Sequence, residues 1–160
     1  MPTKNPQEMP SKGKLFAFDV GTKTYGLAVC DSQHMIASPL KTLSRGKWKQ
    51  DKQTIQALVA EHNVVGAVVG MPLHMTGDMS PRAQAAQAFA ELFEELTDLP
   101  VLLWDERLTT KAAEAALFEQ RTGRQTRASK RDVKQQVDSV AASLILQSAT
   151  QAIQNAHNNA

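Results

Sequence analysis

The chain has 160 residues, 42% of them hydrophobic, which fits one globular domain and excludes a wholly disordered chain. Aromatic residues make up only 5%, which argues against a broad surface for stacking nucleobases, and the formal net charge of +2 alone says little about partners. Cys30 is the single cysteine, so an intrachain disulfide is excluded, and the sequence has no secretory leader and no apolar run of about 20 residues; we therefore expect a cytoplasmic protein without a membrane span.

The two ends of the chain lack a hydrophobic pattern. Residues 1–13 are polar and rich in proline, so we expect a flexible N-terminal arm, and residues 155–160 suggest a flexible tail. The sequence between them contains no low-complexity linker and no internal repeat. We therefore predict one domain over residues 14–154.

The domain opens with three predicted strands. Leu15–Val20 is a short apolar run typical of a buried strand, and Gly26–Cys30 is a second one after a short turn. A connection this short favours an antiparallel hairpin. After the turn at Asp31–His34, a third strand is expected from about Met35 to Leu43, which completes a meander.

The pattern then alternates between helix and strand. Apolar residues at helical spacing mark a first helix: Ile55, Leu58 and Val59. Val64–Val69 is a β-branched run suited to the middle of a parallel sheet. A second helix is expected to begin at Ser80 as the N-cap, with Pro81 in its first turn.

The final third continues the alternation. Val101–Trp104 predicts the fifth strand, and a helix after it is marked by Ala112, Ala113, Ala116 and Leu117. The last helix is expected to begin at Ser129, with Asp132 completing an approximate capping box, and to present an apolar face as far as Ile153. The order βββαβαβαα indicates a mixed sheet flanked by helices, an α/β domain.

Acidic residues lie at the boundaries of predicted buried elements. Asp19 sits inside an otherwise apolar strand, where an unpaired carboxylate is costly. Asp105 and Glu106 follow the fifth strand, and because side chains alternate along a strand, only one of the two can face the same side as Asp19. Asp138 lies at the edge of the apolar face of the last helix, near its amino end.

Each acid also has a purely structural interpretation. Asp19 could cap the turn that follows it, the Asp105–Glu106 pair could precede a helix N-terminus, and Asp138 could pair with Lys134. If Asp19, Glu106 and Asp138 converge, their oxygens suit hard cations such as Mg²⁺, which can activate water and stabilise the leaving oxygen in phosphodiester cleavage. Without a metal ion the clustered carboxylates would repel one another. Spacing alone does not decide between these interpretations.

Four basic residues near these acids are candidate ligands of an anionic substrate: Arg82, Arg107, Lys130 and Lys134. Arg82 opposes the dipole of the helix it begins, which hints at an anion nearby. Arg107 could hold a phosphate or pair with Asp105. The two lysines could contact nucleic acid or offset the charge of Asp138. The basic segment Arg121–Lys134 could attract phosphates or be a solvated loop.

Four ordered segments resemble the YqgF (RuvX) family of Holliday-junction-resolvase-like proteins. They are Phe18–Lys23 with Gly26–Val29, Val69–Gly77, Asp105–Thr110 and Val137–Ala142. The resemblance runs from about residue 14 to residue 150. It departs at His74, where the family often has Asn, so we assign no chemical role to this histidine.

The resemblance implies a ribonuclease H-like fold, with a five-stranded mixed sheet, its second strand antiparallel, flanked by helices. It further implies a nuclease that trims the 5′ end of pre-16S ribosomal RNA and depends on Mg²⁺ or Mn²⁺. The residues it assigns to the metal and to catalysis are Asp19, Glu106 and Asp138, with Asp105 the weaker candidate of the acidic pair. Pre-rRNA, and with it ribosomal particles, would then be the partners.

Two other functions stay open at this stage. The chain could resolve branched DNA, as a Holliday-junction-type resolvase. It could also be a non-catalytic module that binds nucleic acid or nucleotide, since Asp19–Thr22 resembles the first phosphate motif of actin-like ATPases and sugar kinases. Those enzymes close two such domains around ATP, and this chain has the length of one. The sequence does not predict an oligomeric state.

Overall fold

The centre of the fold is a mixed β-sheet. The computed structural model describes residues 1–109 and 130–158, and the side chains of 1–109 and 139–158. Within them the sheet has five strands in the order β3-β2-β1-β4-β5. The strands are β1 (Leu15–Val20), β2 (Thr24–Cys30), β3 (Ala37–Ser44), β4 (Gly66–Met71) and β5 (Val101–Asp105). β2 is antiparallel to both neighbours and β1, β4 and β5 run parallel, which confirms the predicted sheet.

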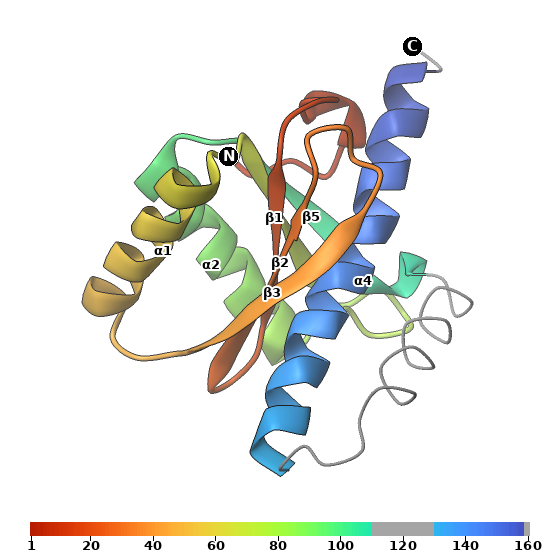
Figure 1. Cartoon of the computed structure of the whole chain (residues 1–160). Helices are drawn as coiled ribbons and strands as arrows, with labels where there is room; N and C mark the ends of the chain where they lie inside the picture. Colours follow the sequence, from red (N-terminus) through yellow and green to blue (C-terminus); the bar gives the residue numbers. More distant parts are fainter. Residues whose placement is uncertain (110–129, 159–160) are drawn as a thin grey trace.

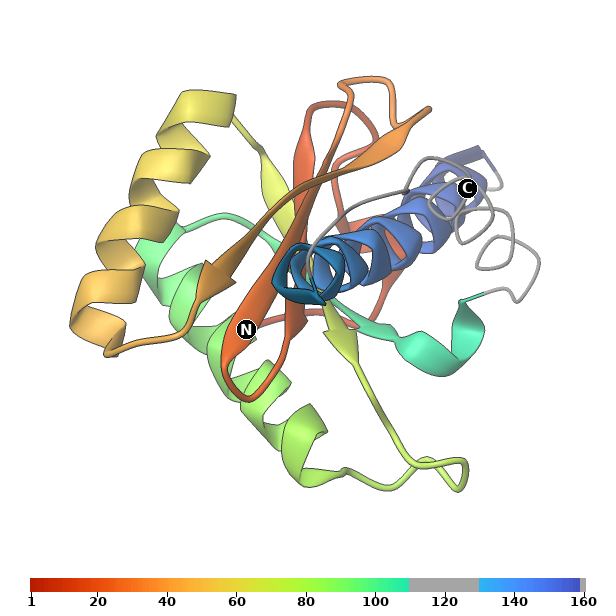
Figure 2. The same ribbon diagram turned by 60° about the horizontal axis from the view of Figure 1, so that its bottom comes forward.

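Helices cover both faces of the sheet (Figures 1 and 2). The helices α1 (Trp48–His62) and α2 (Pro81–Thr97) pack on one face, and α4 (Lys130–Asn158) packs on the other. The helix predicted over Ala112–Leu117, and Ser129 as the start of the last helix, fall outside the described residues. None of the helices described has the combination of length and apolarity that crossing a membrane requires.

The alternation of side chains along β1 decides where its acid lies. Phe16, Phe18 and Val20 point into the core under α1 and α2, whereas Leu15 and Ala17 point into the core under α4. Successive side chains of a strand face opposite sides. Asp19 therefore falls on the α4 face of the sheet.

Local sequence explains the start of α2. The Ser80 hydroxyl accepts a hydrogen bond from the Ala83 amide at 3.0 Å, and Pro81 occupies the first helical turn. Both features were predicted, because Ser satisfies an amide that the helix leaves unpaired and Pro has none to satisfy there. The Ser80 hydroxyl also donates to the Pro72 carbonyl at 2.8 Å, which ties the helix start to the loop before it.

The third strand begins two residues later than expected. The Asp31 carboxylate accepts hydrogen bonds from the amides of Met35 and Ile36, at 2.8 and 2.7 Å, so these amides serve the turn and not the sheet. Both side chains are exposed. The strand therefore begins at Ala37.

The two ends of the chain contact the domain. Thr3 forms an isolated parallel bridge to Leu102 in β5, and Met9, next to the short helix η1 (Pro6–Glu8), is buried. A ring nitrogen of His157 lies 2.7 Å from the Met9 carbonyl, and α4 continues to Asn158, past the predicted boundary at 154. Part of the expected arm thus belongs to the core, because Met9 fills the apolar layer beneath α4.

Candidate active site

The carboxyl ends of β1, β4 and β5 meet at one edge of the sheet. Phe18 is in register with Val69, so Asp19 and Gly70, the next residues of these parallel strands, lie side by side. Glu106 follows the end of β5 and begins the short helix η2 (Glu106–Leu108). α4 begins at this same end of the molecule (Figure 1).

The carboxyl group of Glu106 lies over Gly70. A Cβ atom on Gly70 would be 3.3 Å from both Cγ and Cδ of Glu106 and 2.6 Å from Cδ1 of Ile145 in α4. Glu106 therefore lies on the α4 face of the sheet, as Asp19 does. Because Gly70 has no side chain, the Glu106 carboxyl group has space above it. Oε2 of Glu106 is buried, and no described residue forms a hydrogen bond with it, a costly state for a carboxylate oxygen.

The electrostatics of Glu106 reflect this confinement. The pKa of Glu106 is raised from 4.5 to about 7: burial contributes most to this rise, the neighbouring charge of Asp19 adds to it, Arg82 opposes it, and Asp105 adds a smaller rise. A like charge close by disfavours ionisation of a carboxyl group. The sequence left the convergence of Asp19 and Glu106 open, and the family resemblance implied it. In the structure the two carboxyl groups lie close enough to repel, while their role in holding a metal stays a prediction.

Among the described residues, Arg82 is a cation that lies beside the Asp19–Glu106 pair. Its Nη2 atom lies 3.7 Å from Oδ1 of Asp19, whose side chain is only 15% exposed, while that of Arg82 is 53% exposed. The ion pair is long and open to solvent, so it offsets the two carboxylates only in part. The structure thus places Arg82 beside the acids, in the first turn of α2, where an anion could also reach it.

Asp105 and Arg107 form a second, separate pair. Nε and Nη2 of Arg107 donate to the Asp105 carboxylate, at 3.0 and 2.7 Å, and these hydrogen bonds lower the pKa of Asp105. Nη1 of Arg107 donates to the Met75 carbonyl at 3.1 Å. Of the two roles that the sequence left open for Arg107, the structure contains the pairing with Asp105, and a phosphate contact stays a prediction.

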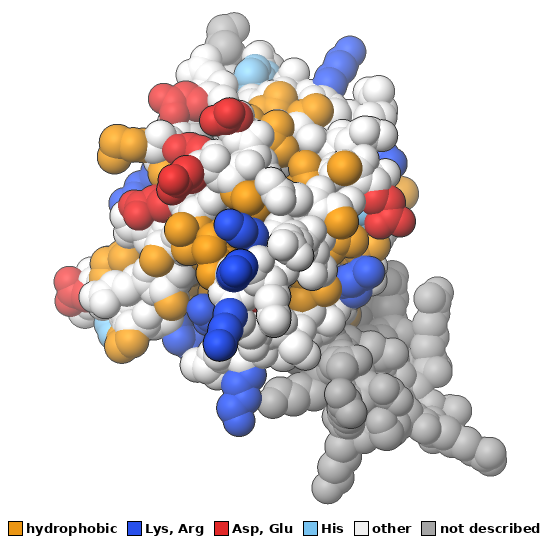
Figure 3. Space-filling model, turned by 90° about the vertical axis from the view of Figure 1, so that its left-hand side faces the viewer, with side chains coloured by type: hydrophobic (Ala, Val, Ile, Leu, Met, Phe, Trp, Pro, Cys, Tyr) orange, Lys and Arg blue, Asp and Glu red, His pale blue; other side chains and the backbone are white. Residues whose placement is uncertain are grey.

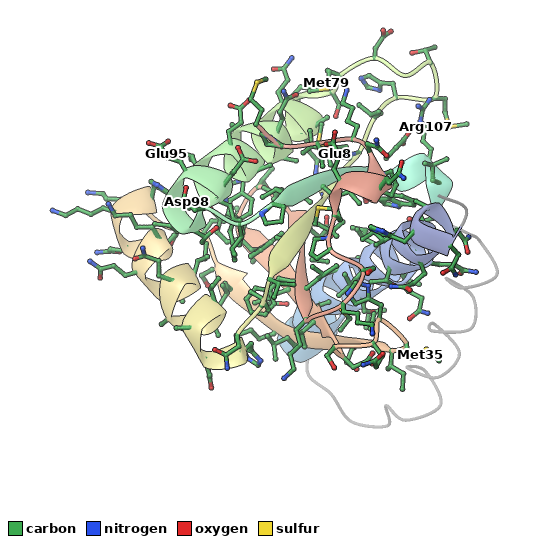
Figure 4. The ribbon with its side chains drawn as sticks, turned by 90° about the horizontal axis from the view of Figure 1, so that it is seen from above. Glu8, Met35, Met79, Glu95, Asp98 and Arg107 are labelled. Atoms are coloured by element: carbon green, nitrogen blue, oxygen red, sulfur yellow. The ribbon has the colours of Figure 1, made fainter. Side chains whose placement is uncertain are left out.

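Arg107 joins the end of β5 to the loop of residues 72–80, and Figure 4 shows it beside this loop, well apart from Glu95 and Asp98 on α2. Within the loop the Gly77 amide donates to the His74 carbonyl at 2.8 Å, and Gly77 has φ +91°, which favours glycine. His74 itself is exposed. The loop of residues 72–80 and η2 therefore lie together at the edge of the acidic site, and the Arg107 guanidinium links them through its hydrogen bonds to Met75 and Asp105.

We expect Arg107→Lys to loosen this link, because a lysine ammonium cannot bind a carboxylate bidentately and reach a second carbonyl in the same geometry. Hydrogen exchange of the Gly77 amide should become several-fold faster, while exchange of the Ala83 amide in α2, bonded to Ser80, should not change. Unaltered exchange at Gly77 would show that Arg107 does not hold the loop.

Three of the predicted site residues lie in the first part of α4, whose side chains are not described: Lys130, Lys134 and Asp138. Asp138 precedes Ile145 by seven residues, about two helical turns, so both lie on one face of α4. Among the described side chains no group of three His, Cys, Asp or Glu could hold a metal ion. The three-acid site therefore stays a prediction, of which the structure supplies two members.

The residues present fit a divalent cation. Asp19 and Glu106 offer the hard carboxylate oxygens that Mg²⁺ and Mn²⁺ prefer, and Oε2 of Glu106 has no hydrogen-bond partner among the described residues. A bound dication would also remove the repulsion that raises the pKa of Glu106.

Sequence reasoning missed Gly70. It sits among β-branched residues in β4, where a glycine weakens a strand unless something approaches closely. A glycine at the end of this apolar strand could have been noticed in the sequence. In the structure, the side chains of Glu106 and Ile145 approach it closely.

Comparison with known proteins identifies the family of the chain. A family model described as "RuvX: Holliday junction resolvase" matches residues 13–152. A curated protein of Novosphingobium aromaticivorans, named "Putative pre-16S rRNA nuclease", is 48% identical over 141 residues, covering 88% of this chain and 86% of the relative. A protein of the same name from Sphingopyxis alaskensis is 46% identical over 145 residues, covering 91% of each chain.

Solved structures share the fold at low sequence identity. RuvC of Thermus thermophilus, in complex with a Holliday junction substrate, has a TM-score of 0.55 at 12% identity, covering 88% of this chain and 94% of that one. The yeast mitochondrial Holliday junction resolvase also has a TM-score of 0.55, at 11% identity, covering 94% and 82%. These likenesses establish the fold alone, and the predicted ribonuclease H-like fold is confirmed.

Proposed function

The chain belongs to the RuvX family, and from this premise we propose that it is a metal-dependent nuclease that processes the 5′ end of pre-16S ribosomal RNA in the cytoplasm. The observation that carries the proposal is the Asp19–Glu106 pair. Two carboxylates meet at the carboxyl edge of the sheet, and one has a buried oxygen with no partner. Keeping two carboxylates close together, with one oxygen buried, costs folding free energy, and such arrangements are concentrated at functional sites. The names of the relatives supply the substrate.

In this proposal Asp19 and Glu106, together with Asp138, hold Mg²⁺ or Mn²⁺. When bound, the ion supplies an activated water and stabilises the charge on the leaving oxygen. The exposed guanidinium of Arg82 binds an oxygen of the scissile phosphate, for which its position beside Asp19 is suited. The apolar end of Ile145 and the side chain of Glu106 both lie over Gly70, and in this proposal Ile145 keeps water from that side of the carboxyl group.

The proposal is tested with a 16S transcript that carries a 5′ extension. The purified protein should shorten the extension in Mg²⁺ or Mn²⁺ and not in excess chelator, as read by mapping the 5′ end. Asp19→Asn should abolish cleavage while leaving the thermal unfolding midpoint nearly unchanged. The matched control is Asp98→Asn, the same chemical change at the left-handed C-cap of α2, a conformation that Asn tolerates. Cleavage by Asp19→Asn at the control's rate would refute the site.

The second candidate is a resolvase of branched DNA, favoured by the description of the family model. A four-way DNA junction assayed beside the RNA separates the two. Faster metal-dependent cleavage of the junction than of the RNA precursor would select the DNA activity, with the same acids in the same roles.

A further inference from the structure

A basic surface leads away from the acidic pair across the start of α1. The segment from Lys41 to Lys52 carries five basic residues against one acid, Asp51, whose carboxylate accepts a hydrogen bond from the Gly46 amide at 3.0 Å. Basic residues here and in the β1–β2 turn reach the surface: Lys23, Lys41, Lys47 and Lys49 are exposed, and Arg45 is half-buried. Figure 3 shows Lys and Arg gathered in a stripe on this side.

Hydrogen bonds to the backbone hold this stripe of basic residues next to the acidic pair. The Arg45 amide donates to the Lys23 carbonyl at 2.8 Å, and the Arg45 side chain donates to the Gly21 carbonyl, two residues after Asp19. Arg45 and Lys23 are thus held at the end of β1. An anionic chain that reaches the acids from this side must pass them.

A hollow of about 310 Å³ lies beside Arg45, between the start of α1 and the middle of α2. Its lining residues are Tyr25, Arg45, Gly46, Trp48, Ala85, Ala88, Phe89 and Leu92. Ala85 lies one helical turn after Arg82, so the hollow begins close to the cation of the active site. The volume is at the lower end of the range for small-molecule sites, roughly 300–1,000 Å³.

Aromatic rings gather at this hollow although the chain has few. The single tyrosine, Tyr25, lies 5.0 Å from Phe89 between ring centroids, and Trp48 lies 6.1 Å from Phe89. The guanidinium of Arg45 stands 5.1 Å from the centre of the Tyr25 ring. Aromatic rings and guanidinium planes are the surfaces on which unpaired bases stack in single-stranded RNA. Tyr25 and Phe89 are buried, so the half-buried Trp48 ring and Arg45 guanidinium are the surfaces that a base could reach here.

We propose that this surface binds a single-stranded RNA segment next to the cleavage site, with phosphates along Lys23, Arg45 and Lys47 and one unstacked base in the hollow against Trp48. The inference rests on the proposed nuclease function. It adds the path that the bound RNA follows on the protein surface next to the acids. The acids of α2 oppose any route along its far half: Glu91, Glu94, Glu95 and Asp98. The bound RNA therefore crosses the start of α1.

Binding is measured by fluorescence anisotropy of a labelled single-stranded RNA in metal-free buffer, so that cleavage plays no part. Lys23→Ala/Lys47→Ala should weaken binding several-fold and make its salt dependence shallower by the equivalent of about two phosphate contacts. The matched control is Lys12→Ala/Lys14→Ala, the same charge change on two exposed lysines before β1, at the opposite end of the sheet. Equal affinity and equal salt dependence in the two double variants would overturn the proposal.

The base in the hollow is tested separately. Trp48→Ala should weaken binding about tenfold, and because this side chain also packs on Phe89, a second measurement avoids the substitution. In Trp104→Phe the remaining tryptophan is Trp48, and RNA should quench its fluorescence. Binding without quenching would exclude a base in the hollow. If the wild-type protein cleaves RNA while these variants bind RNA normally, the proposal of this binding surface alone is refuted. If the protein binds RNA through this surface and does not cleave it, the nuclease function is refuted.

Discussion

Glu106→Gln is expected to abolish cleavage and, in the metal-free protein, to raise the free energy of unfolding at pH 8. The folded-state pKa of Glu106, about 7, lies above the ordinary value of 4.5, so the folded protein binds this proton more tightly than the unfolded chain does. The stabilisation by the proton is complete below about pH 4.5 and is lost as the pH rises through 7. At pH 8 the folded state therefore carries an ionised, buried carboxyl group that Gln would replace with a neutral one.

The size of this gain follows from the same shift. At about 1.4 kcal/mol for each pKa unit between 4.5 and about 7, the upper limit is about 3.5 kcal/mol, and partial solvent exposure reduces it to about 1–2 kcal/mol. Urea unfolding in chelator should show the gain at pH 8 and little of it at pH 5. Glu95→Gln, the same change on the exposed side of α2, should show neither effect. A gain of equal size at both pH values would mean that the charge of Glu106 is not the cause.

Much of the site could be predicted because it depends on local rules. The alternation along Leu15–Val20 fixed the face on which Asp19 lies, and the same rule allowed only one of Asp105 and Glu106 to share it. The choice of Glu106 came from the family resemblance. The structure gives its physical reason: Asp105 is held by Arg107, and Glu106 turns over Gly70.

The basic surface could be predicted only in part. The basic run Lys41–Lys52, which includes Arg45 and Trp48, is visible in the sequence, but its place beside Lys23 and the end of β1 exists only after folding. The same holds for Met9, whose place under α4 depends on contacts with distant segments. Tyr25, Trp48 and Phe89 likewise come from separate segments, and only the fold brings their rings together.

Gly70→Ala is expected to reduce cleavage on the order of tenfold or more while leaving the protein folded. The new Cβ would lie 2.6 Å from Cδ1 of Ile145 and 3.3 Å from Cγ and Cδ of Glu106. The isoleucine end can rotate away, but the Glu106 carboxyl group must then shift by a few tenths of an ångström or more. A catalytic group displaced by about 1 Å can cost about a hundredfold in rate, and overpacking of the site should cost about 1–3 kcal/mol of stability.

Gly66→Ala separates the catalytic effect from this loss of stability. Gly66 lies in the same strand and on the same face as Gly70, four residues earlier, and a Cβ there would be 3.0 Å from the Pro100 carbonyl oxygen and 3.1 Å from Leu15 Cδ2 and Met9 Cε. The overpacking is comparable, but it falls at the opposite end of β4 from the acids. At a temperature where both variants are folded, Gly66→Ala should cleave at the wild-type rate per folded molecule and Gly70→Ala should not. Equal rates in the two variants would mean that the position of the Glu106 carboxyl group does not limit the reaction, because in this pair of glycines only Gly70 contacts it.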